Sequence, residues 1–291
     1  MKKYVLQSIL IFAAIVCLPS MGLALNSGAH IYVTQEVFGS NDVDLLYGSI
    51  APDLSSYVSD PAKWESGFED THYNFIILKP QGWTEPWKRF TIGWMVHNEE
   101  WAADWYSHIE YTYQDGSTGN GYVIDKASML LYALGQLGYP LPGSPEMQMM
   151  IAHNTIEFAI DILIQEYLDG NLGEKLYYVA LNRSDEDVRR LFNILVAKNK
   201  VTDRNTLYQS EMNFRNLILS FSSALAASNS ANQWLPLAVF GSEMANDLYG
   251  VTITPYEVAG LLQMAMSICS NDFEQFLDDT IDGIRGDLRI D

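Results

Sequence analysis

The five histidines are the residues of this chain best suited to chemistry. They are His30, His72, His97, His108 and His153, and all of them lie in the first 153 of the 291 residues. Imidazole is a common ligand of Zn²⁺ and exchanges protons near neutral pH. Structural histidines should scatter along a chain, so this confinement favours a shared site. The residues around each histidine provide the further evidence for such a site.

His153 and Glu157 are four residues apart in a strongly amphipathic segment. On a helix such residues share a face, with Cβ atoms about 6 Å apart. An imidazole and a carboxylate placed in this way can both bind one Zn²⁺ at about 2 Å. Asp161 continues the same face. A solvated acidic stripe with a chance histidine is the alternative explanation, and such pairs are common on helices.

The segment HNEEWAADWYSH, residues 97–108, lies in a predicted long helix over 91–112. On that helix Glu100, Asp104 and His108 recur at every fourth residue, and His97 lies two turns before Asp104. The stripe runs between tryptophans, which is unusual for a surface. It is also costly in a core, because buried carboxylates need partners. Metal ligation resolves this conflict.

Asp53 and His72 come from segments of a different kind. Asp53 follows the rigid pair Ala51-Pro52, and His72 lies in a Trp-, Pro- and Gly-rich stretch predicted to be mostly loop. Both side chains could reach a metal held by helices. A β-turn aspartate and an ordinary loop histidine are the alternative explanations.

Helices are the elements expected to position these residues. Apolar residues recur at helical spacing and sustained Val/Thr alternation is absent, so the predicted fold class is all-α. Thr254-Pro255 with Glu257, and Ser184 with Asp187, are typical of helix starts. The predicted helices cover 29–38, part of 42–57, 91–112, 123–138, 146–169, 174–181, 184–198, 204–228, 232–249, 254–270 and 271–285.

The N-terminus is typical of an export signal. Two lysines precede an apolar stretch, and small residues at Gly22 and Ala24 suit cleavage after Ala24. We expect residues 1–24 to be a signal peptide and the mature protein to be periplasmic or secreted. An uncleaved anchor is the alternative, although the apolar run is short for one. Cys269 would then be the single remaining cysteine, so no internal disulfide is expected.

The charge balance restricts the partners. With 17 basic and 36 acidic residues the formal charge is −19, which argues against stable nucleic-acid binding. A chain of this kind that handles phosphate needs metal or a local basic pocket.

Together these segments resemble the zinc-dependent phospholipase C family, whose helical fold is shared with single-strand-specific zinc nucleases. The resemblance rests on their order along residues 26 to about 165, and it uses every histidine. It implies a phospholipase C-like domain over 25–170 and a helical extension over 171–291 on the same domain. The matching segments are Ala29–Tyr32, Leu46–Asp53, Thr71–Tyr73, Gly93–His97, Ala102–His108 and His153–Glu157.

The resemblance also implies two or three zinc ions in one cleft. One zinc would be held by Asp53, His72, His97 and Asp104, and a second by His108, His153 and Glu157. A third would be held by His30, Asp104 and the mature N-terminal residue Leu25, where the family usually has Trp. Asp53 would also act as the general base.

One departure concerns residues 97–104. The family's helix histidine usually precedes the bridging aspartate by four residues, which here is Glu100. His97 lies about 10.5 Å of helical rise from Asp104. Either Glu100 is the ligand, or the helix is distorted and His97 is.

The function that the resemblance implies is phosphodiester hydrolysis by a zinc-activated water, with a phospholipid or another phosphodiester as substrate and with transient contact with a membrane surface. The alternatives are a zinc phosphodiesterase of the single-strand nuclease type and a non-catalytic metal-binding or interaction protein. Aromatic rings can hold a choline-type cation or stack on bases, although core packing is their ordinary role. The candidate substrate-binding residues are Tyr57, Tyr73, Trp101 and Trp105.

Overall fold

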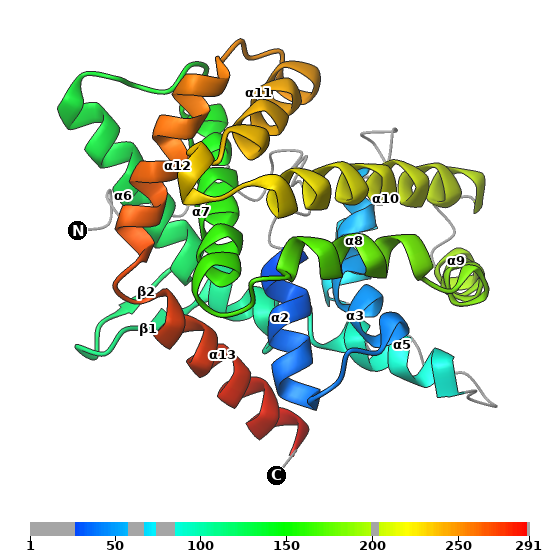
Figure 1. Ribbon diagram of the computed structural model, residues 1–291. Helices are drawn as coiled ribbons and strands as arrows, with labels where there is room; N and C mark the ends of the chain where they lie inside the picture. Colours follow the sequence, from blue (N-terminus) through cyan, green and yellow to red (C-terminus); the bar gives the residue numbers. More distant parts are fainter. Residues whose placement is uncertain (1–26, 58–66, 74–84, 199–203, 290–291) are drawn as a thin grey trace, which may run out of the picture.

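The computed structural model describes residues 27–57, 67–73, 85–198 and 204–289, and this part of the chain is all-α apart from one small hairpin (Figure 1). The predicted fold class is therefore confirmed. The α-helices are α2 (Ser27–Phe38), α3 (Val43–Ile50), α5 (Glu85–Met95), α6 (Tyr122–Leu137), α7 (Pro145–Tyr167), α8 (Leu172–Asn182), α9 (Asp185–Lys198), α10 (Arg204–Ala227), α11 (Leu235–Tyr249), α12 (Pro255–Cys269) and α13 (Phe273–Leu288).

Shorter elements connect these helices. Two of them, η3 (Glu69–Tyr73) and η5 (Trp105–Ile109), are single π-helical turns, and η1 (Ala51–Tyr57) and η6 (Ser230–Asn232) are 3₁₀ helices. Strands β1 (Tyr111–Thr112) and β2 (Thr118–Gly119) pair antiparallel. Single π-helical turns inside helical proteins occur frequently at functional sites.

Helix α7 lies at the centre of the molecule, packed against α6, α12 and α2 (Figure 1). Helix α13 lies beside α2, and α10 lies along α8 and η1. One buried cluster extends from Ala29 to Ile284 and contains residues of every α-helix from α2 to α13. The helices beyond residue 170 thus pack into the same core as the first half.

Buried polar contacts also join the two halves. The Tyr47 hydroxyl donates to Glu211 Oε1 at 2.9 Å, and the Tyr122 hydroxyl donates to Asp272 Oδ1 at 2.6 Å. Phe158 of α7 stacks on Phe221 of α10 with ring centroids 5.2 Å apart. The C-terminal helices therefore support the elements that carry the histidines.

Local sequence signals set several helix ends as predicted. Thr254 and Glu257 form a capping box at the start of α12, in which each side chain satisfies the other residue's backbone N–H. The Ser184 hydroxyl accepts from Asp187 N at 3.2 Å beside the start of α9. Gly138 ends α6 in a left-handed conformation with φ 75°, which a residue without Cβ adopts at little cost.

The predicted helix over 91–112 is wrong, because α5 ends at Met95. Asn98 is fully buried, and its side-chain oxygen accepts from Glu100 N at 2.8 Å and Trp101 N at 3.1 Å. A side chain that satisfies its own following backbone N–H groups competes with the helix. The chain turns here and continues at η5.

No helix in the described part of the chain is long and apolar enough to cross a membrane. The predicted signal peptide and Leu25 lie outside the described residues.

Candidate metal centre

The candidate ligands come from six separate elements that meet at one place. His30 lies on α2, Asp53 on η1, His72 on η3, and His97 in the turn after α5. Asp104 directly precedes η5 and His108 lies within it, while His153 and Glu157 lie one turn apart on α7. Within the described residues, four overlapping groups of three have ligand atoms within 4.8 Å of one another.

The first group, here called the Asp53 group, contains Asp53, His72 and His97. Asp53 Oδ1 lies 3.6 Å from His72 Nε2 and 3.4 Å from His97 Nε2. The histidine rings are buried, whereas the Asp53 side chain keeps 16% of its surface exposed. Asp53 therefore faces both the histidines and the solvent.

The second group, the His30 group, contains His30, His97 and Asp104, all buried. Asp104 reaches both histidines, with Oδ1 at 3.1 Å from His30 Nε2 and Oδ2 at 2.9 Å from His97 Nε2. The two imidazole rings stack with centroids 4.1 Å apart. Since His97 belongs to both groups, these two groups form one continuous cluster.

The third group, the His153 group, contains His108, His153 and Glu157. Glu157 Oε1 lies 3.3 Å from His108 Nε2 and 3.5 Å from His153 Nε2. The π-helical turn η5 brings His108 toward α7. Residues His153 and Glu157 thus share a helix face, as the four-residue spacing predicts.

A fourth group, of Glu99, Asp104 and His108, links the others. Glu99 Oε1 lies 3.8 Å from His108 Nδ1. Asp104 is shared with the His30 group and His108 with the His153 group. Glu99 is the one member of the four groups that the sequence analysis did not select. The two adjacent glutamates, Glu99 and Glu100, were visible in the sequence. The predicted helix over 91–112 placed Glu100 on the ligand face, and for that reason Glu100 was selected instead of Glu99.

Neighbouring groups determine which histidine nitrogens remain available. His97 Nδ1 lies 2.7 Å from the Ser49 carbonyl, which can only accept, so Nδ1 carries the hydrogen. His72 Nδ1 lies 2.7 Å from Thr71 Oγ1, whose hydroxyl donates to Phe68 O. Both Nε2 atoms are left as acceptors in the neutral rings, yet they face each other at 3.2 Å. A cation or a shared proton between them stabilises this arrangement.

The carboxylates show the same need for a cation. Glu157 Oε2 is buried and has no hydrogen-bond partner within the described structure, whereas buried Asp104 Oδ1 pairs with His30 Nε2 at 3.1 Å. Buried oxygens without partners cost free energy. Imidazole nitrogens and carboxylate oxygens are among the ligands that Zn²⁺ binds in proteins. The residues present therefore fit zinc.

The charges in the centre are strongly coupled. Burial alone would raise the pKa of Asp104, but His97 and His30 outweigh burial and hold this pKa well below its usual range. Burial would likewise lower the pKa of His97, but Asp104 and Asp53 raise it well above its ordinary value. These opposite shifts favour a proton on His97 over a proton on Asp104. Metal binding must displace such protons.

The pKa values of His30 and His108 are shifted in opposite directions, although burial lowers both. Burial, together with nearby His97, lowers the pKa of His30. The pKa of His108 is raised well above its ordinary value because Glu157 and Glu99 outweigh the opposing effect of burial. Burial would raise the pKa of Glu99, but His108 lowers it. His108 therefore has a carboxylate on each side.

Asp161 and Glu100 lie outside the metal centre. The Asp161 carboxylate accepts from Gly28 N at 3.0 Å and from Ala29 N at 2.7 Å, so it anchors the start of α2. It therefore supports the helix that carries His30. Glu100 is exposed and belongs to none of the four groups of described residues. The geometry accordingly pairs His97 with Asp104 and leaves the Glu100 alternative without support.

The candidate substrate-binding aromatics have different surroundings. Tyr73 is 41% exposed, and its hydroxyl donates to Glu99 Oε2 at 2.7 Å. Tyr57 packs on Phe214 with centroids 5.8 Å apart, and Trp101 packs against the core. Trp105 is partly buried at the start of η5. Tyr73 thus contacts Glu99 of the centre directly.

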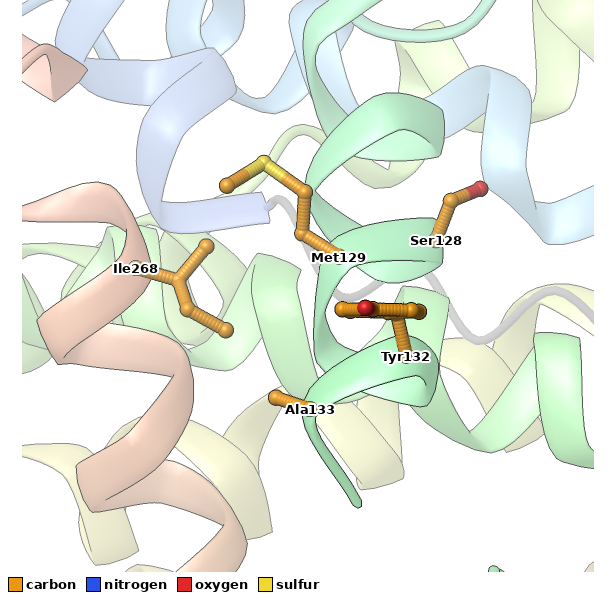
Figure 2. A pocket seen from close by; sticks show the side chains of 5 residues that line it. All are labelled: Ser128, Met129, Tyr132, Ala133 and Ile268. Carbon is orange, nitrogen blue, oxygen red and sulfur yellow. The ribbon is translucent and has the colours of Figure 1, made fainter. Parts of the chain in front are cut away.

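A shallow apolar hollow lies elsewhere on the surface, between α6 and α12 (Figure 2). It is lined by Ser128, Met129, Tyr132 and Ala133 of α6 and Ile268 of α12. These residues provide no ligand of the four groups. This hollow is therefore separate from the candidate metal centre.

No protein-family model, curated protein or solved structure matches this chain. The resemblance to zinc-dependent phospholipases C therefore rests on the sequence segments and their order alone.

Proposed function

We propose that this protein is a zinc-dependent phosphodiester hydrolase of the phospholipase C type. The observation that carries the proposal is the position of Asp104 between two histidines, with Oδ1 facing His30 Nε2 and Oδ2 facing His97 Nε2. A carboxylate that binds one metal through each oxygen places metal positions side by side, as in sites that clamp the attacking and leaving oxygens of a phosphoryl group. We expect two or three zinc ions.

Different ligand groups would hold different zinc ions. The Asp53 and His30 groups would hold zinc through His72, His97 and Asp104, with His30 completing the cluster, and the His153 group would hold another ion. Bound Zn²⁺ supplies Lewis-acid activation of water and neutralises charge on the phosphate. The extra cationic charge suits a chain whose formal charge is −19.

Asp53 has the position required of a proton acceptor. Its carboxylate faces two histidines on one side and keeps contact with solvent on the other. His97 and His72 lower its pKa against the opposing effect of burial. An ionised carboxylate at the edge of the centre can hold and orient a water and accept its proton.

The test uses the purified full chain and its naturally processed form. Zinc per chain is measured by elemental analysis, and hydrolysis is measured on p-nitrophenyl phosphorylcholine, bis-p-nitrophenyl phosphate and single-stranded DNA. We expect at least two zinc ions and the fastest turnover on the choline ester. Asp53→Asn should lower kcat at least 100-fold, in line with general-base loss, whereas the exposed control Glu100→Gln should leave it unchanged.

The outcomes separate the rival functions. Preferential cleavage of DNA would indicate the nuclease-type alternative. Zinc without hydrolysis of any substrate would indicate a non-catalytic metal-binding protein. Absence of zinc after purification and after incubation with excess zinc would overturn the metal centre itself.

A further inference from the structure

Glu99 holds a position that the proposed ligand sets do not use. It lies in the turn after α5, between the His30 group and the His153 group, and its side chain is 10% exposed. Its backbone N–H donates to His72 O at 3.4 Å, which ties this turn to η3. The side chain is therefore held close to both halves of the centre.

The two oxygens of Glu99 have different neighbours. Oε2 accepts from the Tyr73 hydroxyl at 2.7 Å, and Oε1 faces His108 Nδ1 at 3.8 Å. On the opposite side of the same ring, His108 Nε2 faces Glu157 Oε1 at 3.3 Å. Tyr73, Glu99 and His108 thus form a row that leads from the exposed rim of the centre to the His153 group.

The ring geometry indicates which nitrogen of His108 binds metal. Both His108 and His153 direct Nε2 at the same oxygen, Glu157 Oε1, so Nε2 is the nitrogen placed for ligation. A neutral imidazole that ligates through Nε2 carries its hydrogen on Nδ1. That hydrogen needs an acceptor, and Glu99 Oε1 is the carboxylate on that side.

We infer that Glu99 is a positioning residue that accepts from His108 Nδ1 and thereby sets the zinc affinity of the His153 group. This inference rests on the proposed zinc function. A carboxylate that accepts a hydrogen bond from the non-ligating nitrogen of a histidine fixes the ring orientation and makes the ligating nitrogen a stronger ligand. The Tyr73 hydroxyl donates to the other oxygen of the Glu99 carboxylate and so holds it in place. The 3.8 Å separation is longer than a hydrogen bond, so the inferred bond requires the two side chains to move closer when zinc binds.

The experiment compares Glu99→Gln with its sequence neighbour Glu100→Gln, which is exposed and serves as the matched control. Tyr73→Phe removes the outer contact alone. Bound zinc per chain is measured by equilibrium dialysis against buffers of fixed free zinc, and cobalt-substituted protein gives an absorption spectrum of the ligand field. Circular dichroism and zinc-free melting show whether each variant folds like the wild type.

For Glu99→Gln we expect the wild-type number of zinc ions at saturation. One ion should bind 10- to 100-fold more weakly, as is typical when such an outer partner is lost, and the cobalt spectrum should shift. Tyr73→Phe should weaken the same ion by a smaller factor, and Glu100→Gln should match the wild type.

Three results would overturn the inference. If Glu99→Gln binds one zinc fewer at saturation, Glu99 is itself a ligand. If its zinc affinities equal those of the wild type, Glu99 has no role in the His153 group. If Glu100→Gln is equally weakened, the effect belongs to the turn as a whole. A wild-type chain that binds no zinc would instead overturn the proposed function.

Discussion

His97 Nε2 lies 2.9 Å from Asp104 Oδ2, although seven residues separate the two in the sequence. The backbone explains this closeness, since Asp104 N donates to His97 O at 3.0 Å and Ala103 N donates to Val96 O at 3.2 Å. These bonds close residues 98–102 into a turn. A straight helix would have held the two ligands about 10.5 Å apart along its axis.

Replacement of His97 should therefore affect zinc more than replacement of Glu100. His97 belongs to two ligand groups, whereas Glu100 is exposed and belongs to none. We expect His97→Ala to lose at least one zinc and to slow phosphodiester hydrolysis at least 100-fold. Glu100→Ala should retain both properties. Elemental analysis measures the zinc content of both variants, and initial rates measure their hydrolysis. The opposite result would restore Glu100 as the ligand.

Removal of metal should destabilise the fold. Six elements meet at the centre, and in the proposed zinc-bound state their buried carboxylates and imidazoles would lose a shared partner on zinc removal. Zinc at a thousandfold excess over its Kd stabilises the folded state by about 4 kcal/mol. Differential scanning calorimetry with and without a chelator should show a Tm lower by several degrees. An unchanged Tm in zinc-free protein would argue against the site.

Loss of the Asp161 carboxylate should weaken the start of α2. It accepts from Gly28 N and Ala29 N in a fully buried setting. Asp161→Ala leaves both donors without this acceptor, and each unsatisfied group costs about 1–3 kcal/mol. Urea denaturation should show a loss of about 2–4 kcal/mol. Glu166→Ala, five residues further along α7, removes the acceptor of one part-buried donor, Trp234 Nε1, and is the control with a smaller expected loss; equal losses would contradict the anchoring role.

Asp187 should make stability depend on pH in a definite direction. Burial and the nearby Asp44 raise the pKa of Asp187 to about 6. The folded state therefore holds a proton that the unfolded state releases near pH 4, so the free energy of unfolding falls as pH rises from about 4 to 6. Asp187→Asn should remove this slope and stabilise the protein at pH 7 by roughly 1–2 kcal/mol.

Urea denaturation of the wild type and of Asp187→Asn at pH 4.5, 5.5 and 7 measures this difference. Replacement of the exposed neighbour Glu186 is the control, because its ion pairs with Arg189 and Arg190 lie on the surface and contribute little to stability. Parallel pH profiles for the wild type and Asp187→Asn would contradict the assignment.

The exported protein should begin at Leu25. Small residues at Gly22 and Ala24 suit cleavage after Ala24. N-terminal sequencing of protein recovered outside the cytoplasm measures the start directly. A start at Met1 would contradict cleavage and would exclude the Leu25 amine as a ligand, leaving His30 with Asp104 and His97.

Helix periodicity and capping chemistry are local, and for this reason the sequence alone predicts most of the helices. The Thr254–Glu257 capping box and the Gly138 terminus depend on residues within one turn of each other. The five histidines and the spacing of His153 and Glu157 are also visible in the sequence, because one helical turn is enough to place both on one face.

Tertiary structure decided what local patterns could not. The apolar spacing of 91–112 predicts a continuous helix, but buried Asn98 competes for the backbone N–H groups and the surrounding core accommodates a turn. That turn directs Glu99 inward, exposes Glu100, and brings His97 to Asp104. Asp161 shares a helix face with Glu157, yet it binds backbone 132 residues away, at Ala29. Such partners depend on how distant helices pack, and helix periodicity contains no information about that packing.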